Sequence, residues 1–205
     1  MRIIGGVLKG QRLLCPKGQK VRPTTDRAKE ALFQILEARH GFDWPKVQVM
    51  DLFAGSGALG IEALSRRARR AFFVERDRQA LYVIEKNLES CRLGNKATLI
   101  RQDVFSFLRR KAFKPPIKPV SLVLADPPYG KGYSKRLLDL IARTNGLVAN
   151  GGIIVVEEDK RADLLVAVPG SHMKLELLEK RSFGDTAFFF YSATAQGEDN
   201  GLCPE

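Results

Sequence analysis

The chain has 205 residues, enough for one compact domain, and its hydrophobic (44%) and charged (28%) fractions are those of an ordinary globular protein. It contains no apolar run near the roughly 20 residues that span a bilayer, and its first residues are too poor in apolar side chains for a signal peptide. A net charge of +11 favours a polyanionic partner, and we expect a cytoplasmic protein with no membrane partner.

The cysteines and histidines show no pattern of a disulfide framework or a metal site. Cys15, Cys91 and Cys203 lie far apart, and the only histidines are His40 and His172. Zinc sites and disulfide frameworks need pairs or clusters of such residues at close spacing. We therefore expect the protein to bind no metal.

The N-terminus carries much of the positive charge. Residues 1–29 have eight Lys and Arg side chains against one acid, Asp26. Scattered glycines and short apolar pairs over residues 1–22 predict a hairpin or a mobile arm outside the hydrophobic core. We expect this extension to contact nucleic-acid phosphates, whereas a strand pair that braces the sheet is the alternative. Its cationic side chains are Arg2, Lys9, Arg12, Lys17, Lys20 and Arg22.

Helical and strand patterns alternate from residue 26 onward. Pro23-Thr24-Thr25 predicts a stop and a helix cap, and apolar residues recur at helical spacing over residues 26–39. Strands are expected at residues 47–51, 71–75, 97–102, 120–125 and 152–157. The intervening helices are expected to end near residue 66, to cover 77–92, to end near 110 and to cover 134–144, with a short helical stretch near 161–167. This alternation predicts a parallel sheet with helices on both faces.

The alternation stops after residue 167. Two strand-like runs, residues 175–183 and 187–191, are joined by Gly184-Asp185-Thr186, which predicts a hairpin. The fold class is therefore α/β, with a seven-stranded, mostly parallel sheet that ends in a β-hairpin. We expect the main domain over residues 23–192, after the basic extension of residues 1–22 and before a disordered acidic tail over residues 193–205.

A glycine-rich turn, Asp51-Leu52-Phe53-Ala54-Gly55-Ser56-Gly57-Ala58-Leu59-Gly60, follows the first expected strand. Its small residues let the backbone approach a ligand, and the helix behind it offers free N–H groups. Glu75 ends the second strand at the spacing seen in dinucleotide-binding proteins, where an acid binds the ribose. The turn predicts an adenosine-containing ligand, and a tight strand–helix turn without a ligand is the alternative. It does not separate an NAD enzyme from a methyltransferase.

Asp126-Pro127-Pro128-Tyr129 follows the fourth strand, at the edge where open α/β sheets bind ligands. The two prolines fix an extended backbone and remove two N–H donors. An aromatic amine needs acceptors for its hydrogens and a surface for its ring, which carbonyl oxygens, a carboxylate and a tyrosine supply. The loop favours an amino group on a nucleic-acid base as the target, and a rigid loop that only ends a strand is the alternative.

These two motifs resemble those of class I amino-methyltransferases, which have a Rossmann-like fold. Together with Arg22-Pro23-Thr24-Thr25-Asp26-Arg27, Ala31-Leu32-Phe33 and Gly184-Asp185-Thr186, they make residues 1–192 similar to the bacterial RsmD family of small-subunit ribosomal RNA guanine-N2 methyltransferases. The resemblance implies transfer of a methyl group from S-adenosylmethionine to the N2 amine of a guanine in 16S ribosomal RNA. The RNA could be free or part of an assembling small subunit.

The resemblance also implies which residues bind the cofactor. The methionine part would be held by Asp51, Phe53, Ala54, Gly55, Ser56 and Gly57. Glu75 would bind the ribose hydroxyls, and Arg76 would flank the adenine. Asp103 and the Val104 amide would bind the adenine amino group, although Asp103 alone fits a helix N-cap equally well.

Catalysis would belong to the loop of Asp126, Pro127, Pro128 and Tyr129. Hydrogen bonds from the target amine to Asp126 and the Pro127 carbonyl would favour its nucleophilic form and stabilise developing positive charge. Tyr129 would stack on a flipped-out base. The reaction needs no metal and no covalent intermediate, because the sulfonium already carries an activated methyl group.

Other functions fit parts of the sequence. An adenine-N6 methyltransferase would use the same loop, but the chain has no room for a separate target-recognition domain. Glutamine methyltransferases of translation factors usually have Asn in place of Asp126. An NAD-linked oxidoreductase gives residues 126–129 no role, and a non-catalytic RNA-binding module does not explain the intact cofactor motifs.

Overall fold

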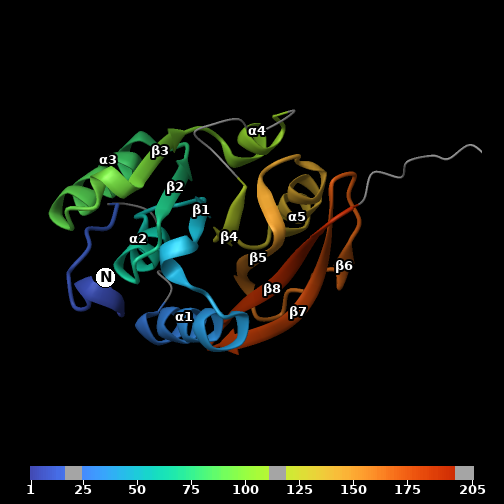
Figure 1. Ribbon diagram of the computed structural model, residues 1–205, viewed down its shortest axis with the longest axis horizontal. Coiled ribbons are helices and arrows are strands. Elements are labelled where there is room, and N and C mark those ends of the chain that lie inside the picture. The colour runs from blue at the N-terminus through green and yellow to red at the C-terminus, as the bar shows by residue number, and fades with distance from the viewer. Residues whose placement is uncertain (17–24, 111–118, 197–205) are drawn as a thin grey trace, which may run out of the picture.

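The computed structural model describes residues 1–16, 25–110 and 119–196. Its strands are β1 (Gln48–Leu52), β2 (Arg70–Glu75), β3 (Ala97–Arg101), β4 (Val120–Ala125), β5 (Val148–Asp159), β6 (Ala167–Val168), β7 (Met173–Phe183) and β8 (Thr186–Ala195). They form one sheet in the order β3-β2-β1-β4-β5-β8-β7-β6 (Figure 1). β1 to β5 are parallel to one another, whereas β8, β7 and β6 are added antiparallel. The predicted α/β fold with a terminal hairpin is confirmed.

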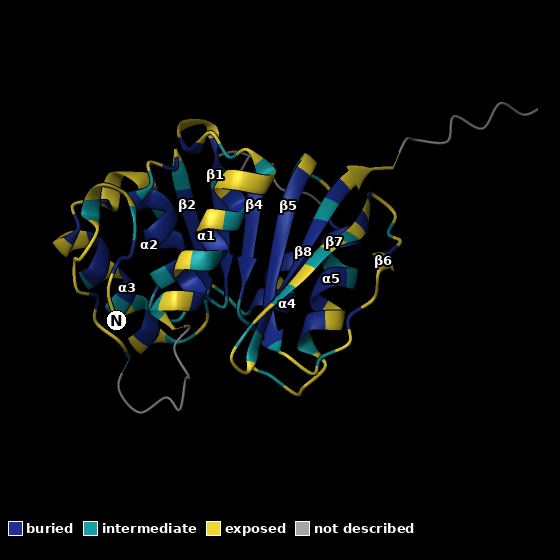
Figure 2. Cartoon of the chain, turned by 90° about the horizontal axis from the view of Figure 1, so that it is seen from below, coloured by how far each residue is buried: buried dark blue, intermediate teal, exposed yellow. Residues whose placement is uncertain are grey.

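The helices cover both faces of the sheet. They are α1 (Asp26–His40), α2 (Ala58–Ser65), α3 (Arg78–Ser90), α4 (Val104–Leu108) and α5 (Tyr133–Arg143), with short 3-10 turns η1 (Gly6–Leu8), η2 (Trp44–Lys46) and η3 (Gly94–Lys96). The first three α-helices contribute to one hydrophobic cluster and the last two to another. Neighbouring residues of β4 alternate between the clusters, so this strand packs against apolar side chains on both faces. Figure 2 shows that β4 is buried along most of its length.

The predicted start of the first helix is confirmed. Thr25 is the N-cap of α1, and its hydroxyl oxygen accepts the N–H of Ala28 at 3.2 Å. The helix ends at Gly41, whose φ of 59° lies in the left-handed region. α1 buries Leu32, Phe33 and Leu36 against the sheet.

The strand order reverses between β1 and β4, which creates a crevice at the carboxyl edge of the sheet. In this parallel pair Asp51 lies opposite Leu124, and Leu52 lies opposite Ala125. Both motif loops therefore start from adjacent positions. The fold alone places the glycine turn beside the loop of residues 126–129.

The sheet has eight strands rather than seven, because the short helix expected near residues 161–167 is absent. Leu164 and Val168 are buried at a spacing that also suits a helix, but the chain is extended at this point. Val168 lies opposite Leu175, so β6 pairs with β7. This pairing satisfies backbone groups that an edge strand would expose.

The predicted start of the acidic tail, at residue 193, is too early. β8 continues to Ala195, and Ala193 is fully buried in the core. Gly184, with a φ of +64°, makes the turn between β7 and β8, as predicted. Residues 197–205 lie outside the described residues.

The N-terminal segment, residues 1–16, forms the predicted hairpin but is not outside the core. Arg2 and Arg12 form an antiparallel bridge, and Ile3 N–H donates to the Gln11 carbonyl at 3.0 Å. Ile3 and Leu13 are buried in the same hydrophobic cluster as α1 and α2. The expectation of a non-core arm is therefore wrong for these residues, because the bridge directs their apolar side chains inward.

Candidate active site

The glycine turn joins β1 to α2 through unusual backbone conformations. Phe53, Gly55 and Gly57 all have positive φ, at 59°, 55° and 76°. The Gly57 N–H donates to the Ala54 carbonyl at 2.7 Å and closes the turn. The N-cap residue of α2, Gly57, supplies no side-chain cap, so the first N–H groups of the helix face the turn.

Gly60 lets α2 approach the sheet closely. A Cβ at this position would lie 2.3 Å from the Phe73 ring and 3.0 Å from the carboxylate of Asp51. The Gly60 N–H donates to Asp51 Oδ2 at 2.9 Å. Any larger residue here would displace α2 and the turn together.

Asp51 is a buried acid, with a side chain only 3% exposed. Burial raises its pKa to about 8, the negative charge of Glu75 adds to this, and the hydrogen bond from Gly60 acts against it. The Asp51 carboxyl group therefore titrates near neutral pH. It is suited to bind a positively charged ligand group.

Glu75 and the glycine turn are brought together as the spacing predicts. Glu75 Oε2 accepts the Gly55 N–H at 3.0 Å. Its Oε1 accepts the N–H groups of Arg76 and Asp77 at 2.8 and 2.9 Å. The carboxylate therefore fixes the end of β2 and the centre of the turn, and the Arg76 side chain is exposed beside it.

Asp103 lies at the end of β3 and serves as the N-cap of α4. Its Oδ1 accepts the Ser106 N–H at 2.9 Å. The adjacent Gln102 N–H donates to the Glu75 carbonyl at 3.1 Å, so the ends of β2 and β3 meet at one edge. Val104, the first residue of α4, is buried. The N-cap role left open by the sequence is present, and it uses one oxygen of the carboxylate.

The loop of residues 126–129 starts directly beside the glycine turn. The Asp126 N–H donates to the Leu52 carbonyl at 3.4 Å. Pro127 is buried, Pro128 is exposed and Tyr129 is half-buried. The loop therefore presents one face to the protein and one to solvent.

Asp126 lies among other acids. Burial is the largest cause of a pKa well above the ordinary aspartate value, followed by the negative charges of Glu157, Asp51 and Glu158. An acid with a raised pKa is a better proton acceptor once ionised. Asp126 can therefore accept a hydrogen bond or a proton from a neighbouring amine.

Glu157 and Glu158, at the end of β5, were missed in the sequence analysis. Their side chains are 2% and 6% exposed. Tyr129 Oη donates to Glu157 Oε1 at 3.1 Å, and Ser134 Oγ donates to Glu158 Oε2 at 2.5 Å. Two consecutive acids at the end of an apolar strand, on the ligand-binding edge, were the available signal.

The N-terminal segment also reaches the glycine turn. Asn87, on α3, is buried and donates to the carbonyls of Ser56 and Leu14 at 3.0 and 3.1 Å. Its Oδ1 accepts the Leu14 N–H at 2.7 Å, and Ser56 Oγ contacts Met1 Sδ at 3.5 Å. One amide side chain thus connects the segment, α3 and the turn.

The predicted cations of the N-terminal extension are placed only in part. Arg2 forms an ion pair with Asp26 at 2.7 Å. Lys9 and Arg12 are exposed. The other three, Lys17, Lys20 and Arg22, lie outside the described residues.

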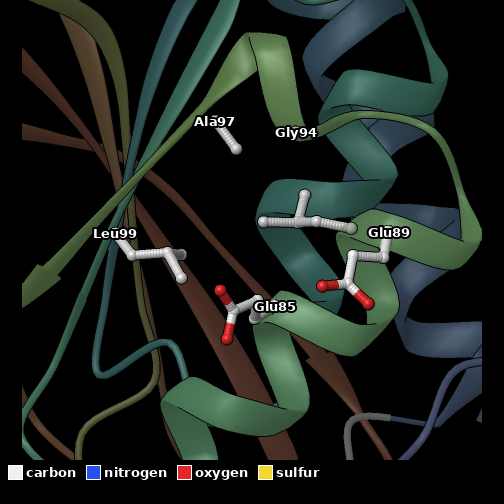
Figure 3. A pocket seen from close by; sticks show the side chains of 6 residues that line it. Glu85, Glu89, Gly94, Ala97 and Leu99 are labelled. Atoms are coloured by element: carbon white, nitrogen blue, oxygen red, sulfur yellow. The ribbon is translucent and has the colours of Figure 1, made fainter.

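A separate groove lies between α3 and the edge strand β3 (Figure 3). It is lined by Glu85, Leu88, Glu89, Gly94, Ala97 and Leu99. Gly94 and Ala97 lie at the amino end of β3, whereas the candidate cofactor residues lie near the carboxyl ends of strands. The groove and the candidate site therefore belong to different parts of the sheet.

Within residues 1–16, 25–110 and 119–196, no three His, Cys, Asp or Glu side chains are grouped to hold a metal ion. None of the helices in this part of the chain is long and apolar enough to cross a membrane.

Comparisons with known proteins place this architecture in a family. A family model described as "Conserved hypothetical protein 95" matches residues 1–192. Ribosomal RNA small subunit methyltransferase D of Escherichia coli K12 is 36% identical over 203 residues, 98% of this chain and 93% of that protein. Its counterpart from Haemophilus influenzae is 33% identical over 167 residues, 80% of this chain and 82% of that protein.

A solved structure extends the comparison to the fold. The protein titled "Putative methyltransferase yhhF from Escherichia coli" has a TM-score of 0.76 and 34% identity, and the match covers 96% of this chain and 99% of that one. The resemblance inferred from the motifs is thus confirmed. The chain belongs to the Conserved hypothetical protein 95 family, the family of ribosomal RNA small subunit methyltransferase D.

Proposed function

We propose that this protein transfers the methyl group of S-adenosylmethionine to the exocyclic N2 amine of a guanine in small-subunit ribosomal RNA. One observation carries the proposal: the glycine turn and the loop of residues 126–129 start side by side, with Asp126 N–H bonded to the Leu52 carbonyl at 3.4 Å. This arrangement sets a cofactor-binding motif against an amine-binding motif. Both are adjacent to the strand reversal, where α/β sheets bind ligands.

The residues at the edge fit S-adenosylmethionine chemically. Asp51, Glu75 and Asp103 are acidic acceptors that suit the ammonium group, the ribose hydroxyls and the adenine amine, respectively. The start of α2, where Gly57 supplies no side-chain cap, offers N–H groups besides that of Gly60, which donates to Asp51, to the carboxylate of the cofactor. When bound, the cofactor supplies a methyl group on a positively charged sulfur, which needs no further activation.

The loop residues bind and orient the target amine. The Asp126 carboxylate and the Pro127 carbonyl accept the two amine hydrogens, which localises the nitrogen lone pair and stabilises positive charge on that nitrogen. Asp126 then takes the proton that the methylated amine loses, a task helped by its raised pKa. Tyr129 receives the ring of the base, which must leave its stack to reach a partly buried site.

Two further parts of the proposal concern the RNA and the cell. Lys9 and Arg12 are exposed on the N-terminal segment, which also contacts the glycine turn through Ser56. We assign RNA phosphates to these cations, and to Lys17, Lys20 and Arg22 by sequence alone. The substrate is small-subunit RNA during assembly, in the cytoplasm.

The test combines a strain without this gene and purified variants. Mass mapping of ribosomal RNA nucleosides should show the loss of one N2-methylguanosine, and a missing N6-methyladenosine would redirect the proposal to adenine. Asp126→Ala should lower methyl transfer roughly 10²- to 10³-fold, the range for loss of one preorganised charge-stabilising group. Calorimetry should show S-adenosylhomocysteine bound with little change. Wild-type turnover in the variant would contradict the role of the loop.

A further inference from the structure

The Gly184-Asp185-Thr186 turn contacts the loop of residues 126–129, here called the target loop, although the proposed chemistry gives the turn no role. Thr186 begins β8, and its Oγ1 lies 3.4 Å from Tyr129 Oη. Lys160, just beyond β5, holds the turn in place: its N–H donates to the Asp185 carbonyl at 2.8 Å, and its Nζ pairs with Asp185 Oδ1 at 3.1 Å. The turn is therefore fixed beside the target loop.

β5 supplies a second contact to the same hydroxyl group. Tyr129 Oη donates to Glu157 Oε1 at 3.1 Å. Val156 lies opposite Ala125 in the parallel pair of β4 and β5, so Glu157 follows at the position that corresponds to Asp126. A hydrogen bond from a phenol to a carboxylate is charge-assisted and stronger than a neutral one.

These contacts restrain the tyrosine ring at its far end. The backbone before Tyr129 is already fixed by Pro127 and Pro128. Burial, and then the charge of Glu157, raise the pKa of Tyr129, so its hydroxyl stays protonated and remains a donor. With both ends held, the two side-chain torsions of Tyr129 have little freedom.

We propose that Glu157 is a positioning residue for methyl transfer: together with Thr186, it holds the Tyr129 ring in the orientation that receives the target base. The inference rests on the proposed function, since it deepens the role of the loop. Glu157 acts through the tyrosine hydroxyl and does not touch the base. The Gly184-Asp185-Thr186 turn thereby belongs to the target-binding side of the site.

Kinetics with small-subunit ribosomal RNA at saturating S-adenosylmethionine test this inference. Glu157→Leu removes the acceptor and should raise KM for RNA roughly 10- to 100-fold, the fold-change expected for a lost hydrogen bond to a charged group. Glu157→Gln keeps an oxygen at this position and should restore most of the affinity. In KM for RNA, Tyr129→Phe should match Glu157→Leu, and the double variant should show no further rise, because both changes remove the bond between Tyr129 and Glu157. Glu157→Leu should in addition change the pH dependence of kcat, because it also removes a charge that raises the pKa of Asp126.

Tyr191→Phe is the matched control. It removes the hydrogen bond of another phenol, that of the fully buried Tyr191, from Oη to the Leu165 carbonyl at 2.9 Å, and should lower stability while KM stays unchanged. Additive effects in the double variant, or an unchanged KM in Glu157→Leu, would overturn the inference. If Glu157→Leu does not fold, an unchanged KM in Tyr129→Phe overturns it instead. A wild-type protein that methylates no RNA overturns the proposed function, and this inference with it.

Discussion

Two groups of buried or half-buried acids have their charges balanced in different ways in this protein. Glu62, on α2, is fully buried and faces two cations. Lys29 Nζ lies 3.7 Å from its Oε2, and Arg66 Nη2 lies 3.2 Å from its Oε1. The same carboxylate accepts the N–H groups of Ile4 and Gly5 at 2.8 and 2.7 Å. Both carboxylate oxygens of Glu62 are therefore bound by other groups of the protein.

The acids at the carboxyl edge are balanced differently. Among the described residues, no Lys or Arg forms an ion pair with Asp51, Asp126 or Glu158. Burial raises the pKa of Asp51 and Asp126, and neighbouring acids raise both further. A buried charge without a counter-charge costs free energy unless it is neutralised by a proton or a ligand. The comparison separates an acid whose charge is balanced inside the protein from acids for which no Lys or Arg of the described residues supplies a counter-charge.

The largest expected effect comes from a change of Glu62, the acid that is paired with Lys29 and Arg66. Glu62→Gln should lower the free energy of unfolding by about 3–5 kcal/mol, because Lys29 stays buried without its carboxylate. Chemical denaturation measures this loss. The matched control is Glu89→Gln, since the pair of Glu89 and Lys86, at 2.7 Å, is exposed to solvent and should contribute little to stability. Equal stability in the two variants would remove the distinction drawn for Glu62.

The second prediction concerns Asp51 and has the opposite sign. Its pKa is about 8 in the folded protein and near 3.8 when unfolded, so between these values the folded state holds one more proton. The stability contributed by Asp51 should therefore fall as the pH rises from about 4 to 8, by at most about 1.4 kcal/mol per pH unit. Asp51→Asn keeps an acceptor for Gly60 and should remove this slope.

Asp51→Asn should also weaken the binding of the cofactor. Unfolding curves between pH 5 and 8 should show Asp51→Asn gaining stability over the wild type as the pH rises. Calorimetry at pH 8 should show weaker binding of S-adenosylmethionine, because the ionised carboxylate is gone. A variant that lost stability at every pH, as Glu62→Gln should, would place Asp51 in the first group.

Much of this comparison could be drawn from the sequence, because both motifs follow strands. Alternating apolar runs predict parallel β-strands, and the carboxyl ends of parallel strands share one edge. The adjacency of Asp51 and Asp126 follows from that topology once β1 and β4 are neighbours.

The rest depends on tertiary contacts that no local pattern contains. Ile4 and Gly5 bind an acid 57 or more positions later in the chain, so a short, Gly-rich leader gave no sign of its anchoring. The contact of Tyr129 with Glu157 depends on the register between β4 and β5. β6 was missed because two apolar residues four apart fit a helix and a strand pairing equally well.

A third, smaller effect is expected where the two regions meet. Asn87→Ala removes the amide that binds Leu14 and Ser56, and should cost about 1–3 kcal/mol of stability, because buried polar groups lose their partners. Unlike Glu62→Gln, Asn87→Ala should also weaken the binding of S-adenosylhomocysteine, as measured by calorimetry, since Ser56 belongs to the glycine turn. Asn95→Ala, at an exposed position in η3, is the control. Unchanged cofactor affinity would show that the anchored segment and the turn are independent.

The smallest effect is expected for the exposed cations of the N-terminal segment, which take no part in the ion pairs around Glu62. Lys29 and Arg66 neutralise a buried acid, whereas Lys9 and Arg12 are exposed and form no ion pair with any acid in the described ranges. Lys9→Gln combined with Arg12→Gln should leave unfolding and cofactor affinity unchanged and weaken binding to small-subunit RNA.

The salt dependence of RNA binding separates this role from a structural one. Each lost phosphate contact should reduce the slope of log K against log salt by about 0.7–0.9, so the double variant should lose about 1.4–1.8. The control is Arg143→Gln with Lys174→Gln, which removes two cations already paired with Asp139 and Glu176. An equal slope in both double variants would mean that the anchored segment only braces the sheet. Because Glu62 holds that segment through its backbone, its exposed cations can be exchanged for neutral residues without loosening it, and any change in slope then reports on RNA alone.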